Sequence, residues 1–311
     1  MGLEGKVVFI TGGARGIGAA VATEAARRGA RISLSGLEPE LLARNAAAIG
    51  AGTPHFDCDV TDMASVQAAV DGTVAELGGV DIVLANAGIG SYGTAEKGDP
   101  DAWIRTVDIN LNGVYRTVHA ALPHVIERRG HIGVVASIAS FAPLAGMSSY
   151  NASKAGVEAF VRALRQEVGF RGVSAGTIHP SWIDTDLVRG AENDLASFRE
   201  ARRKLPWPVR SVTSVEACAK AIVDGFEKRS SRVFVPRSAA LMYWLRSLIT
   251  SDAAEGVMAK EMPATVPRME REVAALGRSA GEHAAGINDL DQSAEKAPNA
   301  EEPETTPAVT S

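Results

Sequence analysis

A glycine-rich turn near the N-terminus joins a β-branched apolar run to a stretch of helical character. The apolar run covers residues 7–10, the turn at residues 11–18 reads TGGARGIG, and the helical stretch continues to Arg28. A strand, a glycine turn and a helix start in this order form a site for a pyrophosphate, because glycine lets the backbone come close and the helix start offers free N–H groups. Such a turn also occurs where a helix simply packs closely on a strand, so its meaning depends on the rest of the chain.

The rest of the chain alternates apolar runs of strand length with longer amphipathic stretches. This pattern is typical of a parallel sheet flanked by helices. We predict strands at residues 6–11, 31–35, 54–58, 81–86, 131–137, 173–179 and 232–235. Helices are expected in the gaps, including residues 64–77, 101–128, 150–169 and 214–228. Right-handed crossovers through these helices give a doubly wound α/β fold.

The length of 311 residues fits one large domain and a tail. We expect a catalytic α/β domain over residues 1–236, a C-terminal helical extension over 237–277 and a disordered acidic tail over 278–311. The tail is rich in Ala, Glu, Pro and Thr and has no aromatic residue, so it cannot bury enough surface to offset its ordering entropy. Residues 186–212 look irregular and are expected to overhang the carboxyl ends of the strands.

Composition excludes several classes of function. The formal net charge of −5 comes without a basic block, which argues against nucleic-acid binding. The two cysteines, Cys58 and Cys218, cannot build a disulfide framework and lack C-x-x-C spacing. No signal peptide or spanning segment is evident, so we expect a cytoplasmic protein. No cluster of His, Cys and carboxylates suggests a metal site, and none is expected.

A second group of residues can carry acid–base chemistry. Tyr150 and Lys154 are four residues apart and share one face of a predicted helix. A nearby ammonium lowers the pKa of a phenol, which lets Tyr150 give a proton to a carbonyl oxygen or take one from an alcohol. Ser137 follows an apolar run thirteen residues before Tyr150, and its hydroxyl could bond the same oxygen. Alone, the Tyr–Lys pair would be an ordinary surface pair; the glycine turn makes chemistry the better interpretation.

Together these motifs resemble the classical short-chain dehydrogenase/reductase family. The turn matches the pattern T-G-x-x-x-G-x-G, and the serine precedes Y-x-x-x-K by the family's thirteen residues. The resemblance covers roughly residues 3–235. Further matches are Asn86-Ala87-Gly88, with Ala85 at the family's first asparagine, Asn110 three residues before Gly113, and the segment 180–185, where Ser181 replaces a glycine.

The resemblance implies a Rossmann fold and hydride transfer between a nicotinamide cofactor and a carbonyl or alcohol. The implied catalytic residues are Asn110, Ser137, Tyr150 and Lys154. The implied cofactor-binding residues are Gly12, Arg15, Gly16, Ile17, Gly18, Gly36, Asp59, Val60, Asn86, Ala87, Gly88, Tyr150, Lys154, Pro180, Ile183 and Thr185. In the family the lysine binds ribose hydroxyls, the asparagine holds a water of a proton relay, and the aspartate that Asp59 matches contacts the adenine. Asp59 could instead be a helix N-cap.

The choice between NAD(H) and NADP(H) depends on the end of the second strand. An acidic residue there bonds a ribose 2′-OH and repels a 2′-phosphate. That position is Gly36, and Glu38 lies two residues later in a segment that starts a helix. Arg15 is a base that could reach a 2′-phosphate, or only a solvated loop residue. We therefore favour NADP(H) over NAD(H).

The substrate is expected to be a medium or bulky hydrophobic ketone or secondary alcohol. The segments 89–95, 140–149 and 182–208 should shape its pocket, and they are more apolar than sugar binding requires. Their apolar residues, some of which could simply fill the core, include Phe141, Pro143, Leu144, Met147, Trp182, Leu187 and Leu195.

Two other functions fit the motifs: a reductase of carrier-bound 3-oxoacyl chains, and a dinucleotide-binding regulatory protein without turnover. The first would need a basic surface, for which Arg199, Arg202, Arg203 and Lys204 are candidates. By resemblance we expect a homo-dimer or homo-tetramer. Residues 239–249, with Tyr243 and Trp244, could lie on a membrane surface, but packing over the pocket or against a partner subunit is favoured.

Overall fold

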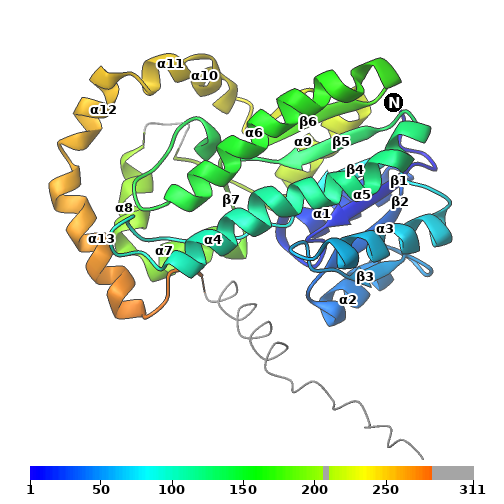
Figure 1. The fold of residues 1–311 in the computed structure, drawn as a ribbon, viewed down its shortest axis with the longest axis horizontal. Helices are drawn as coiled ribbons and strands as arrows, with labels where there is room; N and C mark the ends of the chain where they lie inside the picture. The colour runs from blue at the N-terminus through cyan, green and yellow to red at the C-terminus, as the bar shows by residue number, and fades with distance from the viewer. Residues whose placement is uncertain (206–209, 282–311) are drawn as a thin grey trace, which may run out of the picture.

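The chain folds around a seven-stranded parallel sheet (Figure 1). The computed structural model describes residues 1–205 and 210–281. The strand order is β3-β2-β1-β4-β5-β6-β9. The strands are β1 (Val7–Thr11), β2 (Arg31–Gly36), β3 (His55–Asp57), β4 (Ile82–Ala85), β5 (His131–Val135), β6 (Ser174–Pro180) and β9 (Arg232–Val235). All neighbours pair in parallel, so the predicted doubly wound α/β sheet is confirmed.

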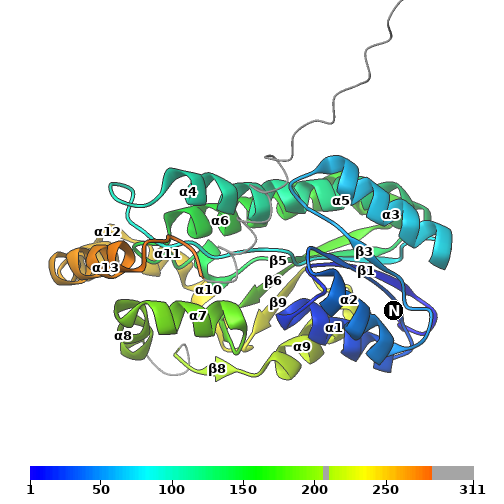
Figure 2. The ribbon, with the colours of Figure 1, turned by 90° about the horizontal axis from the view of Figure 1, so that it is seen from below.

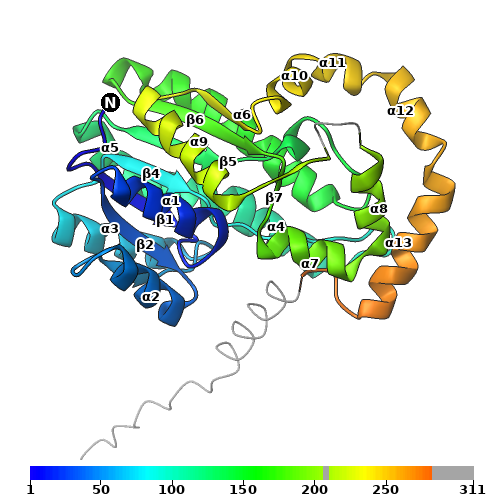
Figure 3. The ribbon, with the colours of Figure 1, turned by 180° about the vertical axis from the view of Figure 1, so that it is seen from behind.

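Helices cover both faces of the sheet, as Figures 2 and 3 show from two sides. One face carries α1 (Gly16–Arg27), α2 (Pro39–Ile49) and α9 (Val215–Lys228). The other carries α3 (Met63–Leu77), α5 (Gly113–Glu127) and α6 (Ser148–Val168). Each face has its own apolar core, and every residue of β1 is buried. Strands covered on both faces read as continuous apolar runs, which is why the sequence identifies them well.

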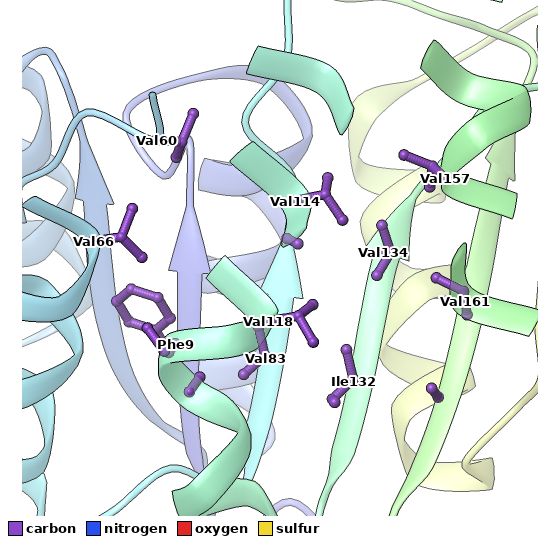
Figure 4. Packing of buried hydrophobic residues seen from close by; sticks show 14 of the residues in the cluster. Phe9, Val60, Val66, Val83, Val114, Val118, Ile132, Val134, Val157 and Val161 are labelled. Atoms are coloured by element: carbon purple, nitrogen blue, oxygen red, sulfur yellow. The ribbon is translucent and has the colours of Figure 1, made fainter. Parts of the chain in front are cut away.

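The core under α3, α5 and α6 is built largely from valines, and Phe9 is its fully buried aromatic residue (Figure 4). Phe9 of β1 packs among Val66 of α3 and Val118 of α5, while Val157 and Val161 of α6 lie over β5. Branched apolar side chains from the strands and the helices pack together in this layer. This layer supports the sheet, and the carboxyl ends of β1, β4, β5 and β6 lie together at one of its edges.

The helix predicted over residues 101–128 is interrupted. The structure has α4 (Pro100–Val107), a π-helical turn η1 (Asp108–Asn112) and then α5. In η1 the Gly113 N–H bonds the Asp108 carbonyl, five residues back. A π-turn adds one residue and displaces the apolar pattern after it by one position, a local shift that hydrophobic spacing does not locate. It also places Asn110, fully buried, toward the sheet.

The segment predicted to be irregular, residues 186–212, contains two helices. They are α7 (Asp186–Asp194) and α8 (Ala196–Lys204), followed by residues 206–209, which lie outside the described part. A short ladder joins β7 (Trp182–Ile183) to β8 (Val212–Thr213). These helices are rich in Arg, Glu and Asp. Ala191 of α7 and Phe198 of α8 pack with Met269 and Val273, far away in sequence, rather than on the sheet. Local periodicity is therefore too weak to predict them.

The C-terminal extension forms α10 (Ala239–Trp244), α11 (Arg246–Ile249), α12 (Asp252–Ala259) and α13 (Met262–Leu276). Met269 and Val273 of α13 pack with Tyr92 and Leu195. After α13 the chain stays on the domain: the Ser279 carbonyl accepts a hydrogen bond from the Tyr92 N–H at 2.8 Å. The tail predicted for residues 278–311 thus begins with packed residues, and it lies outside the described part from residue 282 onward. Among the described helices, none is long and apolar enough to cross a membrane.

Buried His131, the first residue of β5, makes stability depend on pH. Its Nδ1 lies 2.7 Å from the Ser174 Oγ, and burial, with a smaller contribution from the charge of Arg229, lowers its pKa to about 3. The unfolded imidazole has a pKa of about 6.5. Between these values the unfolded chain binds more protons than the folded one, so the free energy of unfolding falls as the pH drops below about 6.5.

We predict that His131→Gln makes this fall shallower, because glutamine does not titrate. His131 should contribute about 1.4 kcal/mol for each pH unit within the window. Urea unfolding of parent and variant between about pH 7 and pH 5 measures the difference. The exposed His55, changed in the same way, is the control and should keep the parental slope. Equal slopes for the His131 variant and the parent would contradict the assignment.

Candidate active site

The predicted functional residues gather at the carboxyl ends of β1, β4, β5 and β6. In a doubly wound sheet this edge is where ligands bind, at the point where the strand order reverses. β1 and β4 are neighbours at that point, with β2 following β1 on one side and β5 following β4 on the other. The site is therefore a product of topology as well as of local sequence.

The glycine turn leaves no room for a side chain at Gly12 or Gly18. Gly12 and Gly16 have φ values of +66° and +56°, a region that favours glycine. A Cβ on Gly18 would lie 2.2 Å from the Gly12 carbonyl oxygen. Arg15 is the N-cap of α1 but makes no side-chain cap bond, and the first turn of α1 has no acidic residue. The helix start can therefore offer its N–H groups to a phosphate, which fits the pyrophosphate of a dinucleotide.

The segment 86–88 ties the end of β4 to this turn. The Asn86 Nδ2 donates to the carbonyl oxygens of Thr11 at 3.1 Å and Gly12 at 3.0 Å. The Thr11 Oγ1 accepts from the Asn86 backbone N–H at 3.1 Å. A Cβ on Gly12 would lie 2.9 Å from the Ala87 Cα, so the two chain segments touch directly.

The segment 180–185 closes the opposite side of the turn. Pro180 ends β6, and Ile183 of β7 is buried. Thr185, the N-cap of α7, has its Cγ2 3.6 Å from the place where a Cβ of Gly16 would lie. Ser181, in the family's glycine position, does not adopt a positive φ, so the substitution leaves the turn intact.

Arg15 is held by two carboxylates. Its Nε donates to Glu38 at 2.9 Å, and its Nη1 lies 3.4 Å from an oxygen of Asp186. The hydrogen bond to Glu38 is the main cause of its raised pKa. Gly36 ends β2 beside the turn, as expected. A carboxylate is nevertheless close by, because Glu38, two residues further on, reaches Arg15.

The remaining predicted cofactor residues lie around the same edge. The side chain of Ile17 packs against the core under α1. The Asp59 Oδ1 accepts from the N–H and the hydroxyl of Thr61, both at 2.8 Å. Asp62, not Asp59, caps α3, so the N-cap reading of Asp59 is wrong. The Arg116 guanidinium donates to the Val60 carbonyl oxygen at 3.2 Å.

Tyr150, Lys154 and Ser137 come together where β5 ends and α6 begins. The Lys154 Nζ donates to the Val135 carbonyl at 2.8 Å and lies 5.7 Å from the centre of the Tyr150 ring. Ser137 follows β5, and its Oγ accepts from the Ala139 N–H at 3.1 Å. A Cβ on Gly88 would lie 3.6 Å from the Lys154 Nζ. The glycine turn, residues 86–88 and the Tyr–Lys pair thus form one continuous site.

Burial dominates the electrostatics of this pair. It raises the pKa of Tyr150, and a hydrogen bond with the Ser137 side chain offsets part of that rise. Burial also lowers the pKa of Lys154 to about 8. The Lys154 ammonium donates to the Val135 carbonyl, and burial dominates the pKa of Tyr150.

Asn110 is part of the same cluster. Its Oδ1 accepts from the Ile89 N–H at 2.8 Å, and its Nδ2 donates to the Ile89 carbonyl at 2.9 Å. Its Oδ1 would lie 3.0 Å from a Cβ on Gly88. The side chain therefore clamps the loop after β4, and η1 brings it there.

Sequence reasoning missed the polar groups that support these residues. The Asn110 Nδ2 also reaches the Ser153 Oγ at 3.3 Å. The Ser137 carbonyl accepts from the Ser140 Oγ at 2.7 Å and faces the His179 Nδ1 at 3.2 Å. Ser153 lies beside Lys154 in the Tyr–Lys motif and could have been chosen on that ground. Ser140 and His179 carry no such signal, because they meet only through the pairing of β5 and β6.

The apolar residues expected to line a substrate pocket are divided between core and surface. Phe141, Trp182 and Leu195 are buried; the Trp182 ring, for example, packs edge-on against Phe198. For these three the core-filling alternative holds. Leu187 is exposed and lies 3.8 Å from the place of a Cβ on Gly90. Pro143, Leu144 and Met147 are exposed or half-buried on the loop before α6.

A cavity of about 290 Å³ lies beside the site, between the loop after β4 and α4. Ser91, Thr94, Trp103 and Ser149 are among its lining residues. Its lining residue Ser149 precedes Tyr150 in the sequence, but neither Tyr150 nor Lys154 lines the cavity. Within residues 1–205 and 210–281, no group of His, Cys, Asp and Glu is arranged to hold a metal ion.

Comparison with known proteins gives the family. The profile of the short chain dehydrogenase family matches residues 6–196. An oxidoreductase named SadH from Mycobacterium tuberculosis is 36% identical over 245 residues, which cover 75% of this chain and 86% of SadH. D-threitol dehydrogenase from Mycolicibacterium smegmatis is 39% identical over 191 residues, 60% of this chain and 73% of that protein.

A solved structure agrees in sequence and fold. The 3-ketoacyl-(acyl-carrier-protein) reductase from Brucella melitensis, crystallised with NADH, superposes with a TM-score of 0.68. It is 28% identical, and the match covers 75% of this chain and 97% of that one. The chain belongs to the short-chain dehydrogenase family and is an NAD(P)-dependent oxidoreductase.

Proposed function

We propose that Tyr150 exchanges a proton with the substrate oxygen while a hydride passes between the nicotinamide and the carbon that bears this oxygen. In the reducing direction the carbon gains the hydride, the oxygen gains the Tyr150 proton, and a ketone becomes an alcohol. The observation that supports this proposal is one cluster of side chains. Tyr150 shares a hydrogen bond with Ser137 and lies beside Lys154, next to the glycine turn. Ser137 would donate to the same oxygen, where negative charge develops.

Lys154 and Asn110 would support this transfer. With a pKa of about 8, Lys154 is mainly an ammonium at neutral pH and can bind ribose hydroxyls as well as favour the phenolate. Asn110, clamped to Ile89, would position the loop after β4 and hold a water that connects Lys154 to solvent. The bound cofactor would supply or accept the hydride.

The cofactor-binding residues of this proposal are those that surround the turn. The start of α1 would hold the pyrophosphate, and Asp59 and Val60 would lie along the adenine side. Residues 86–88 and Pro180, Ile183 and Thr185 would line the nicotinamide side. NADP(H) is the preferred cofactor in this proposal, with Arg15 binding the 2′-phosphate. Glu38 works against that preference, because it already occupies the Arg15 guanidinium.

The substrate would be a hydrophobic ketone or secondary alcohol. Support comes from Leu187 opposite Gly90 and from the apolar loop at residues 143–147. The relatives differ in what their names specify, since one acts on D-threitol and another is an acyl-carrier reductase. The pocket residues of this chain therefore carry the proposal.

Reduction of a carrier-bound 3-oxoacyl chain is the alternative, favoured by the Brucella melitensis reductase. The basic residues on α8 support it poorly. Arg202 pairs with Glu192, Lys204 lies 3.2 Å from Glu261, and Arg199 donates to the Glu192 carbonyl at 2.7 Å. Cations already paired on the protein attract an acidic carrier less.

Subunit contacts through α5 and α6 would give a homo-oligomer. Tyr115 on α5 is 52% exposed and packs edge-on against Phe160 of α6. An aromatic pair at the surface is typical of an interface core. The cytoplasm is the proposed compartment, and both cysteines are buried free thiols, as a reducing environment allows.

The proton-transfer role predicts that Tyr150→Phe reduces kcat about a hundredfold to ten-thousandfold, because the ring remains and only the acid is lost. The assay follows oxidation of reduced cofactor with the best substrate from a panel of apolar ketones. Tyr115→Phe, a matched change on the surface, should retain parental turnover. A Tyr150→Phe protein as fast as the parent would reject the mechanism.

The cofactor proposal predicts a higher kcat/KM with NADPH than with NADH. Arg15→Ala should lower the NADPH:NADH ratio by about tenfold, since one charge-assisted bond to phosphate is lost. Glu38→Gln should raise the ratio, because the guanidinium is released and a repelling carboxylate removed. Parallel kinetics with both cofactors measure the ratios. Equal or better turnover of the parent with NADH would refute the preference.

A further inference from the structure

The short helices α10 and α11 present large apolar side chains to solvent. Leu241, Trp244, Leu245 and Leu248 are exposed, Trp244 by 70% and Leu241 by 64%; we call these four residues the arm face. A group of this kind is costly in water and marks a surface that meets an apolar partner. Figure 1 shows α10, α11 and α12 as an arc at one end of the molecule, and α12 packs mainly on its neighbours α11 and α13.

The arm face is held firmly by the opposite side of α10. Tyr243 is buried there, and its hydroxyl donates to the Glu158 Oε1 of α6 at 2.9 Å. Its ring packs edge-on against Phe141, with 5.3 Å between the centroids. The exposed side chains are thus presented by an anchored helix rather than by a frayed end.

Arginines surround this anchor. The guanidinium groups of Arg246 and Arg232 lie over the Tyr243 ring, 4.4 and 4.9 Å from its centroid. Arg165 of α6 is close enough to Arg232 and to the exposed Arg162 that their charges, after burial, lower its pKa. Glu158 is the carboxylate that acts on Arg165. It already accepts hydrogen bonds from the hydroxyls of Tyr243 and Ser140.

Glu158 compensates the positive charge of the cluster only in part. The Nε and Nη2 of Arg165 and the Nε of Arg232 are buried without a hydrogen-bond partner among the described residues. Buried N–H groups of a cation are expensive to leave unpaired. The cluster therefore gains from a nearby negative surface, which screens its mutual repulsion.

We propose that the arm face binds the surface of an anionic lipid bilayer. Leu241, Trp244, Leu245 and Leu248 would enter the headgroup region. Arg237, which is exposed two residues before α10, would face lipid phosphates together with Arg162 and Arg246. Helices with apolar and aromatic residues beside arginine are suited to this interface. The arm is far too short to span, with six residues in α10 and four in α11, so it lies on the surface.

A second copy of the chain fits this face less well. A two-fold contact would place the arm face on itself and bring the arginine cluster toward its own image, where like charges repel. The acidic residues of the arc, Asp252 and Glu255, lie on α12 rather than on α10 or α11. They would have to point away from the lipid, which the separate helix α12 permits.

Vesicle flotation of the full-length protein tests the proposal. One set of vesicles contains phosphatidylcholine alone, and the other contains equal amounts of phosphatidylcholine and phosphatidylglycerol. We expect binding to the mixed vesicles, weaker binding at high salt, and little binding to phosphatidylcholine. Leu241→Ser with Trp244→Ser should weaken binding at least about tenfold, because two apolar side chains no longer enter the lipid.

Two further variants separate the contribution of charge to vesicle binding from non-specific hydrophobic adsorption. Arg162→Gln with Arg237→Gln should lower binding to the mixed vesicles and leave phosphatidylcholine binding unchanged. Phe170→Ser removes an equally exposed apolar side chain elsewhere and should bind as the parent does. The proposal is overturned if the parent ignores both vesicles, or if the Leu241/Trp244 variant binds as well as the parent. It is also overturned if light scattering shows an oligomer that only this variant loses while no vesicle binding occurs.

Discussion

The close approach of α1 to the end of β1 is the contact on which the site depends. Gly18 sits against the Gly12 carbonyl, at a distance that excludes even a methyl group. This contact lets α1 begin directly beside the strand, so its uncapped N–H groups point over the edge of the sheet. Asn86 then fastens the end of β4 to the same turn. The position of the start of α1 and of the end of β4 at this site therefore depends on these backbone contacts.

Desolvation governs the chemistry of the neighbouring side chains. The same burial that raises the pKa of Tyr150 lowers that of Lys154, so both groups are pushed toward their neutral forms. The hydrogen bonds to Ser137 and to the Val135 carbonyl limit the cost of holding them there. A proton exchange between a phenol and a substrate oxygen needs only small changes in charge when the surroundings already disfavour ions.

Much of the fold could be predicted because the sheet is buried on both faces. The seven strands appear as apolar runs, and the motif residues Thr11, Asn86 and Ser137 lie at the ends of those runs, so their convergence followed from parallel topology. The turn η1 could not be predicted, because its extra residue shifts the apolar spacing by only one position within a long helical stretch. Nor could α7 and α8, whose few apolar side chains pack on α13, far away in sequence.

Contacts between distant segments explain the other differences. Glu38 starts α2 as its N-cap, as expected, but only the folded chain brings its carboxylate to Arg15, twenty-three residues earlier. Phe141 was expected to line a pocket, but Tyr243 of the C-terminal extension covers it. Tyr243 also shows why the extension resisted interpretation: one side of α10 completes the core while the other stays in solvent.

Titration of reduced cofactor against Gly18→Ala, followed by nicotinamide fluorescence, tests the central claim most directly. The added methyl group would meet the Gly12 carbonyl, so the start of α1 must move from the phosphate position. Binding should weaken at least about tenfold, while circular dichroism shows a folded protein. Gly256→Ala, whose Cβ meets nothing within 4 Å, should bind as the parent does. A folded Gly18→Ala protein with parental affinity would contradict the account.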